Sequence, residues 1–247
     1  MGAQFGHAED KELEVFMEAG NKFINLDTTN PAGIAKAKAL NLASSGLVDA
    51  IVTSYVHEAS ELFSTSHRGR FFTVMRDPIE RAVSMHGYLG RATWEANYDP
   101  AFATMSLEEY AKSNKVENNW MTRFLSNQMT GEVTESHLAV AKEILRTKFV
   151  VGIMKEFNTT MGHFEKYFEW QIVNRPHRMK CVENMVSGGS NRHRYAREHA
   201  IKGSQAYSLL HWQNQLDVKL YHYAQQLFQE QSDYFDKIPR PTTGTLK

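Results

Sequence analysis

Arg76 and Ser84 are the residues whose types and spacing are best suited to chemistry on an anionic ligand. Arg76 directly follows an apolar run and directly precedes an Asp-Pro pair, and Ser84 lies further along the helix that this pair is expected to open. A guanidinium and a hydroxyl that converge beside a helix start can bind a phosphate group through charge-assisted hydrogen bonds. The alternative is that Arg76 only pairs with a nearby carboxylate and that Ser84 is an incidental helix residue.

The residues around Arg76 predict a strand, a turn and the start of a helix. Residues 71–75 are aromatic, β-branched or apolar, as a buried strand prefers. Asp77 suits the N-cap of the helix, Pro78 its first position, and Glu80 the acidic position of a capping box. Arg76 is therefore expected at the carboxyl end of a strand, where open α/β sheets bind their ligands.

The wider pattern predicts an α/β fold in which a parallel sheet is flanked by helices. Residues 48–56 and 149–154 are the other clear strand candidates, and a short helix is expected between 56 and the central strand. Strands that alternate with helices in this order imply parallel pairing. The longest apolar stripe at helical spacing runs from Leu209 to Leu227 and predicts a C-terminal helix. No internal boundary stands out, so we expect residues 1–247 to form a single domain.

Composition limits the classes of function. The chain has 247 residues, enough for a sizeable core, and its 28 basic residues equal its 28 acidic ones. Zero net charge provides no global attraction to nucleic acid or anionic membrane, so any polyanion site must be a local patch. The single cysteine, Cys181, excludes an internal disulfide framework and a Cys-rich zinc site. We find no membrane-spanning run, no secretory signal at Met1, and no metalloprotease, Rossmann or nucleophile-elbow motif.

The motif Arg76-Asp77-Pro78-x-x-Arg81-x-x-Ser84-x-x-x-Tyr88 resembles the 3′-phosphate-binding motif of sulfotransferases that use 3′-phosphoadenosine 5′-phosphosulfate (PAPS). The similarity is closest to the Golgi carbohydrate sulfotransferases, including the heparan sulfate enzymes. It implies a P-loop nucleotide-type fold, PAPS as co-substrate without a metal, and transfer of a sulfuryl group to a hydroxyl, most often on a carbohydrate. It also implies that Arg76 and Ser84 hold the 3′-phosphate and that the protein works in the Golgi.

The resemblance covers about residues 24–228 and includes the segments 149–161 and 214–228 in the family's order. The family's N-terminal phosphate-binding loop, whose Lys contacts the 5′-phosphosulfate, has no counterpart, because the chain contains no Gly-Lys pair. We therefore expect an N-terminally incomplete domain, with any membrane attachment through a segment absent from this chain. Two interpretations remain open: an active sulfotransferase, or a non-catalytic nucleotide- or glycan-binding remnant. A third, a helical interaction module, predicts no sheet at all.

Sulfuryl transfer needs a base for the acceptor hydroxyl, cationic groups for the leaving phosphate, and alignment of both partners. His57 is the candidate base, because histidine titrates near neutral pH and His57 is expected at the carboxyl end of the strand 48–56. The alternative is a surface or helix-capping histidine. Glu58 is the competing base, and the two side chains should point to opposite faces if the strand continues through them.

The loop 185–194 is the second candidate for anion binding. Gly188 and Gly189 permit close backbone approach, and Arg192 and Arg194 supply positive charge. Late basic or Gly-containing loops often close over the nucleotide in sulfotransferases, so we assign Arg192 to nucleotide binding; a solvated surface loop is the alternative. Trp120 and Arg123 are candidates to line an acceptor groove, although core packing explains Trp120 equally well. A glycosylation sequon stands at residues 158–160.

Overall fold

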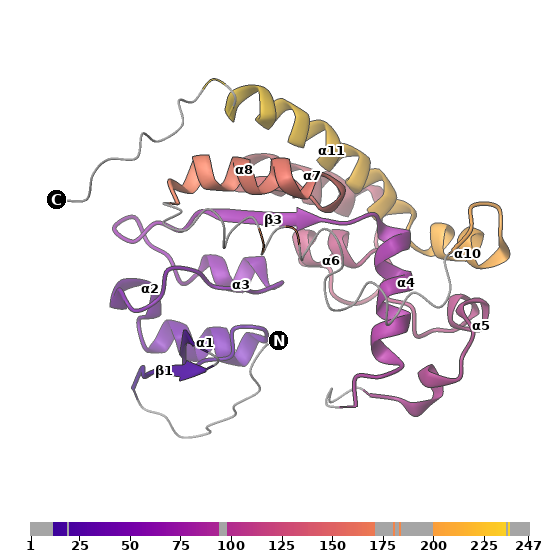
Figure 1. The fold of residues 1–247 in the computed structure, drawn as a ribbon, viewed down its shortest axis with the longest axis horizontal. Helices are drawn as coiled ribbons and strands as arrows, with labels where there is room; N and C mark the ends of the chain where they lie inside the picture. Colours follow the sequence, from indigo (N-terminus) through magenta and orange to yellow (C-terminus); the bar gives the residue numbers. More distant parts are fainter. Residues whose placement is uncertain are drawn as a thin grey trace. The chain divides into compact units, whose positions relative to one another are not determined.

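The computed structural model describes residues 12–18, 20–93, 98–170, 180, 183, 200–235 and 237 (Figure 1). The chain divides into two compact units. The N-terminal unit comprises the chain up to Arg70 together with Asn127–Met129, and the C-terminal unit comprises Phe71–Ser126 and the chain from Thr130 onward. The single domain expected from the sequence stays a prediction.

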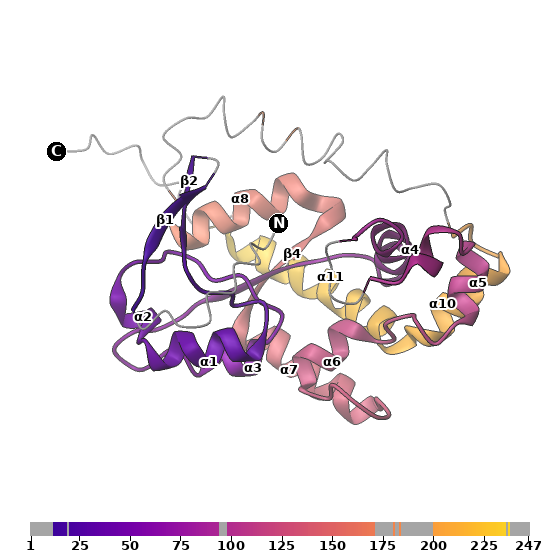
Figure 2. The same cartoon turned by 90° about the horizontal axis from the view of Figure 1, so that it is seen from below.

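Within its described residues, the N-terminal unit contains a hairpin and three short helices. The antiparallel strands β1 and β2, the two adjacent arrows in Figure 2, pair with each other. Val15 lies opposite Ile24. Asn30 caps the first helix, because its side chain accepts a hydrogen bond of 2.8 Å from the backbone N–H of Gly33. Gly46 ends the second helix at a φ of 70°. The elements are β1 (Val15–Glu18), β2 (Asn21–Ile24), α1 (Pro31–Ala39), α2 (Leu42–Ser45) and α3 (Val56–Ser60).

The predicted strand at 48–56 is wrong. Residues 48–55 form no regular element, and Val56 begins α3. The β-branched side chain of Val52 is 77% exposed, and the carbonyl of Val52 accepts a hydrogen bond from the hydroxyl of Thr28. A strand requires a neighbouring backbone and a surface against which its side chains pack. Residues 48–55 have the composition of a strand, but the Val52 carbonyl accepts its hydrogen bond from the Thr28 side chain and not from a neighbouring strand.

The parallel sheet lies in the C-terminal unit. Strands β3 (Phe71–Met75) and β4 (Phe149–Ile153) pair in parallel, with Phe71 opposite Phe149 and Met75 opposite Ile153. The two strands predicted at these positions are confirmed, and the alternative of a module without a sheet is wrong. Because the pairing is parallel and in register, both strands end at the same edge of the sheet.

Helices flank this sheet. Figure 1 shows α8 and α11 on the same side of β3, and α7, α8 and α11 all pack on β4. The predicted C-terminal stripe forms two helices instead of one, because the chain breaks at Asn214, and Trp212 within the stripe is 68% exposed. None of the described helices combines the length and apolar character needed to span a membrane. Among the described residues of this unit, the helices are α4 (Pro78–Leu89), η1 (Pro100–Ala103), α5 (Leu107–Lys112), α6 (Trp120–Ser126), α7 (Glu135–Lys148), η2 (Met154–Glu156), α8 (Phe157–Phe168), α10 (Gln205–Gln213) and α11 (Gln215–Phe235).

Strand β4 is completed by side chains from the helices around it. Gln231 on α11 accepts a 2.8 Å hydrogen bond from the N–H of Val151 and donates one of 3.0 Å to the carbonyl of Phe149. Thr160 on α8 accepts a 2.9 Å hydrogen bond from the N–H of Ile153. These side chains bind backbone groups that a further strand would bind, and they fix α8 and α11 to the sheet.

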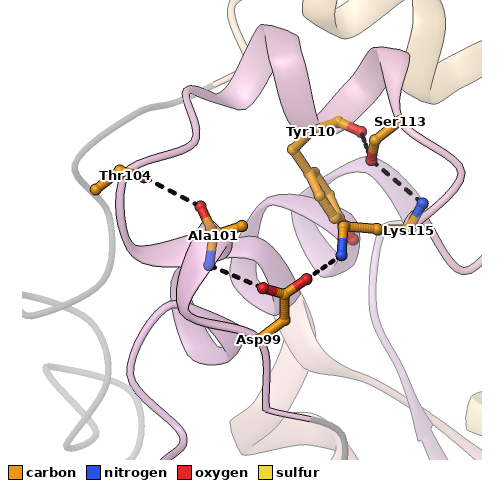
Figure 3. A network of polar contacts seen from close by, with 6 residues as sticks. All are labelled: Asp99, Ala101, Thr104, Tyr110, Ser113 and Lys115. Atoms are coloured by element: carbon orange, nitrogen blue, oxygen red, sulfur yellow. Dashed lines mark hydrogen bonds and ion pairs between the residues drawn. The ribbon is translucent and has the colours of Figure 1, made fainter.

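Polar contacts fix the segment around α5 (Figure 3). Asp99 accepts a 2.9 Å hydrogen bond from the N–H of Ala101 and pairs with the ammonium of Lys115. Ser113 donates a 2.7 Å hydrogen bond to the carbonyl of Tyr110 and accepts one of 3.2 Å from the N–H of Lys115. The capping box predicted for Ser106 and Glu109 at the start of α5 is confirmed. Together these contacts hold the buried ring of Tyr110 in a core shared by α4, α5 and α10.

Candidate functional site

The site begins where β3 ends and α4 starts. Asp77 caps α4, because one of its carboxylate oxygens accepts hydrogen bonds of 2.9 Å from the N–H of Ile79 and 3.1 Å from that of Glu80. Pro78 is the first residue of the helix, as predicted. Arg76 therefore occupies the single position between the buried end of the strand at Met75 and the cap, at the carboxyl edge of the sheet.

Glu80 bridges two cations at this edge. Its carboxylate lies 3.8 Å from Nε of Arg76 and 3.0 Å from Nζ of Lys155, and Lys155 Nζ also lies 4.0 Å from Oδ2 of Asp77. The capping box predicted for Glu80 is replaced by these ion pairs. The expectation that Arg76 pairs with a nearby carboxylate is thus met, which leaves open whether it also binds a ligand. Each of the three bridged side chains is 41–53% exposed, so the cluster faces solvent.

Ser84 shares a face of α4 with Glu80. Residues four apart on a helix are neighbours, with about 5–6 Å between their Cβ atoms, so Ser84 lies one turn beyond Glu80 on the same face, whereas Arg76 precedes the helix. Ser84 is half-buried. Among the contacts of the described residues, the partner of Arg76 is the Glu80 carboxylate.

Lys155 was not identified from the sequence, although the signal was present. It is the second residue after β4, just as Arg76 is the first residue after β3, and parallel strands end at one edge. The hydrogen bond to the Glu80 carboxylate raises the pKa of the Lys155 ammonium, and the nearby Asp77 adds to this effect. The edge therefore holds two basic side chains, one following each strand.

The two candidate bases lie in the N-terminal unit. His57 is the second residue of α3 and not the end of a strand, and its carbonyl accepts a 2.6 Å hydrogen bond from the hydroxyl of Ser60. Glu58 lines a hollow of about 370 Å³ between α1 and α3, beside the ion pair of Lys38 with Glu61. On a helix, neighbouring side chains are about 100° apart, so the expected opposite orientation of His57 and Glu58 does not apply. The role of His57 as a base stays a prediction.

Other residues considered from the sequence fall outside this cluster. Arg192, with the rest of the loop 185–194, lies outside the described residues. Trp120 packs on Phe124 with ring centroids 4.5 Å apart, and the guanidinium of Arg81 lies 4.2 Å from the Trp120 ring. Arg123 donates a 2.7 Å hydrogen bond to the side chain of Asn118. Local packing thus accounts for Trp120, and an acceptor role for Trp120 and Arg123 stays a prediction.

No protein-family model, curated protein or solved structure matches this chain. Interpretation of the site therefore rests on the chemistry of its residues. Within the described part of the chain, no three His, Cys, Asp or Glu side chains gather as a metal site would require.

A second hollow adjoins Asp77 within the same unit. It has a volume of about 490 Å³ and lies between the start of α4 and the helices α10 and α11. Its lining includes Lys202, Tyr207, His211 and Tyr221. Tyr221 is 3% exposed, its hydroxyl has no hydrogen-bond partner among the described residues, and burial raises its pKa. Such a mixture of aromatic and polar groups suits a hydroxylated ligand.

Proposed function

We propose that this chain is a sulfotransferase-type domain that binds PAPS and transfers its sulfuryl group to a hydroxyl of a carbohydrate. The observation that supports the proposal is the position of Arg76 at the carboxyl edge of a parallel sheet, with Ser84 on the helix that follows it. This is the edge at which open α/β sheets bind ligands. The choice of PAPS as the ligand comes from the resemblance of the motif around Arg76 to the 3′-phosphate-binding motif of sulfotransferases.

Arg76 and Ser84 have complementary roles in this proposal. The guanidinium binds the 3′-phosphate of the nucleotide through charge-assisted hydrogen bonds, and the Ser84 hydroxyl donates a further one. In a P-loop nucleotide-type fold, the loop bearing the 5′-phosphosulfate contact would adjoin the same edge; Arg192 is a proposed further nucleotide contact.

The reaction balances without a metal. The acceptor oxygen attacks the sulfur of PAPS, the sulfur–oxygen bond to the 5′-phosphate breaks, and the base takes the acceptor proton. The products are a sulfate ester and adenosine 3′,5′-bisphosphate. His57 is the proposed base and Glu58 its competitor. The hollow beside Asp77, lined by aromatic and hydroxyl side chains, is a candidate acceptor site.

We further propose a Golgi location for the domain, by the resemblance of its motif to carbohydrate sulfotransferases. The sequon at Asn158 stands at the start of α8, where the Asn158 side chain is exposed. The hydroxyl of Thr160, the third residue of the sequon, is buried and bonded to the backbone of Ile153. Any glycan would therefore be added before α8 packs on β4.

The second candidate is a binding remnant without activity, and a specific feature of the sequence favours it. The chain has no Gly-Lys pair from which to build the loop that contacts the 5′-phosphosulfate. A remnant of this kind would retain affinity for the 3′-phosphate and lack turnover. Binding and turnover must therefore be measured separately.

Titration calorimetry with adenosine 3′,5′-bisphosphate tests the proposal. Loss of a hydrogen bond to a charged group costs about 1.5–3 kcal/mol, so Arg76→Ala should weaken binding about 10- to 150-fold, and Ser84→Ala should weaken it less. Arg146→Ala is the matched control, because Arg146 pairs with Glu143 on α7 and is not at the sheet edge. Equal affinities of the wild type and Arg76→Ala contradict the proposal. Sulfate transfer from labelled PAPS to a panel of glycans then separates the enzyme from the remnant.

A further inference from the structure

We propose that Glu80 is an internal stand-in for the ligand phosphate, and that Lys155 joins Arg76 in binding that phosphate when Glu80 turns away. This inference rests on the proposed function, because it concerns the same site. It assigns to Lys155 a binding role that the sequence motif does not contain. It also makes Glu80 a determinant of affinity.

The contacts of Glu80 carry the inference. One of its carboxylate oxygens lies 3.8 Å from Nε of Arg76 and the other lies 3.0 Å from Nζ of Lys155. The carboxylate thus occupies the position between a guanidinium and an ammonium that an anionic ligand of the edge would occupy. A phosphate carries more negative charge than a carboxylate and has three oxygens to bind both cations.

The three side chains have freedom to exchange partners. Arg76, Glu80 and Lys155 have side-chain exposures of 41%, 47% and 53%, so none is locked by packing. Exposed ion pairs contribute about 0–1 kcal/mol, which a phosphate ligand can exceed. Asp77 differs from Glu80, because its carboxylate is held by two backbone N–H groups of α4. Glu80 is therefore the carboxylate that moves, while Asp77 keeps the helix capped.

Charge arithmetic gives the direction of the effect. Arg76 and Lys155 together carry two positive charges, and Glu80 and Asp77 carry two negative ones. A bound phosphate adds negative charge to this neutral cluster. Removing the charge of Glu80 should therefore strengthen phosphate binding, and removing that of Lys155 should weaken it.

Two substitutions test the inference with adenosine 3′,5′-bisphosphate as the probe. Glu80→Gln should lower Kd about 2- to 5-fold, the range expected for an exposed charge contact, and Lys155→Met should raise it by a similar factor. The matched controls are Glu143→Gln, which removes the partner of Arg146, and Lys219→Met, which removes the partner of Glu135. Both controls should leave Kd unchanged. Thermal unfolding of each variant verifies that it is folded.

The possible results separate this inference from the proposed function. If Arg76→Ala weakens binding while Glu80→Gln and Lys155→Met leave it unchanged, the inference is overturned and the proposed function stands. A higher Kd for Glu80→Gln also overturns it, because Glu80 would then assist binding. If the wild-type protein does not bind the nucleotide, or Arg76→Ala binds equally well, both fail.

Discussion

The carboxylate of Asp217 on α11 accepts two hydrogen bonds from Thr122 on α6, one from its backbone N–H and one from its hydroxyl, each 2.7 Å long. The arrangement is reciprocal, because Asn119 before α6 accepts hydrogen bonds from the N–H groups of Leu216 and Asp217 at the start of α11. Asp217 of α11 thus caps the start of α6, and Asn119, which precedes α6, caps the start of α11. This pairing ties α11, which covers β4, to α6.

Asp217→Ala should reduce the free energy of unfolding by about 3 kcal/mol. Asp217 is 1% exposed, and its removal leaves the N–H groups of Met121 and Thr122 and the Thr122 hydroxyl without their acceptor. Chemical denaturation measures the effect. Asp233→Ala on the exposed face of the same helix is the matched control and should change stability by less than about 0.5 kcal/mol. Equal stabilities of the two variants would show that the cap is dispensable.

Gly152→Ala and Gly162→Ala should have opposite effects on stability. A Cβ on Gly152 in β4 would lie 2.3 Å from Cγ2 of Thr160 and 2.9 Å from the ring of Phe164, so α8 could not approach the strand. We expect a loss of about 1–3 kcal/mol. Gly162 in α8 has open space around it, so alanine there should gain about 0.5–1 kcal/mol through helix propensity. Thermal unfolding of both variants provides the comparison, and a stable Gly152→Ala protein would contradict this packing.

We expect the buried phenol of Tyr110 to make the protein less stable at alkaline pH. Burial raises the pKa of its phenol to about 12, and the nearby Glu117 adds to the rise. The unfolded chain releases this proton near pH 10, whereas the folded chain keeps it, so stability should fall as the pH rises from about 10 to about 12. The contribution lost is on the order of 2–3 kcal/mol. Tyr110→Phe should flatten this part of the pH profile in denaturation experiments; an unchanged profile would show that Tyr110 is not the cause.

Local signals in the sequence predicted the elements on which the site depends. The runs predicted as strands at 71–75 and 149–154 contain β3 and β4, and Asp77 and Pro78 start α4, because a helix cap is encoded within a few residues. Residues 48–56 carried the same composition and formed no strand, because pairing depends on a neighbour that composition does not specify. The bridge from Glu80 to Lys155 links residues 75 positions apart and was not predicted for the same reason.

The pairing of charges at the site could not be predicted from the sequence motif either. The motif contains Arg76 and Ser84 and leaves position 80 unspecified; the capping signals at the helix start predicted a capping role for Glu80. In the structure, Asp77 satisfies the helix start by itself, which releases Glu80 to bind cations. The folded arrangement therefore determines the charge at this edge of the sheet, because it brings the Glu80 carboxylate to the positive charges of Arg76 and Lys155.

His57→Ala should lower the rate of sulfate transfer and leave the affinity for adenosine 3′,5′-bisphosphate unchanged. A general base contributes about 10²- to 10⁴-fold to a rate, and the proposed contacts to the 3′-phosphate, Arg76 and Ser84, lie in the other unit. Transfer from labelled PAPS and titration calorimetry measure the two quantities. His67→Ala is the matched control, because His67 is an exposed histidine of the same unit, bonded to its neighbour Ser66.

Glu58→Gln completes this comparison, because Glu58 follows His57 on α3 and competes for the role of base. If transfer falls in His57→Ala and persists in Glu58→Gln, the histidine takes the acceptor proton. The reverse pattern assigns the proton to Glu58, whose carboxylate lines the hollow between α1 and α3. Full activity in both variants removes α3 from the mechanism and directs the search for the base to the C-terminal unit, where His211 and His222 line the hollow beside Asp77.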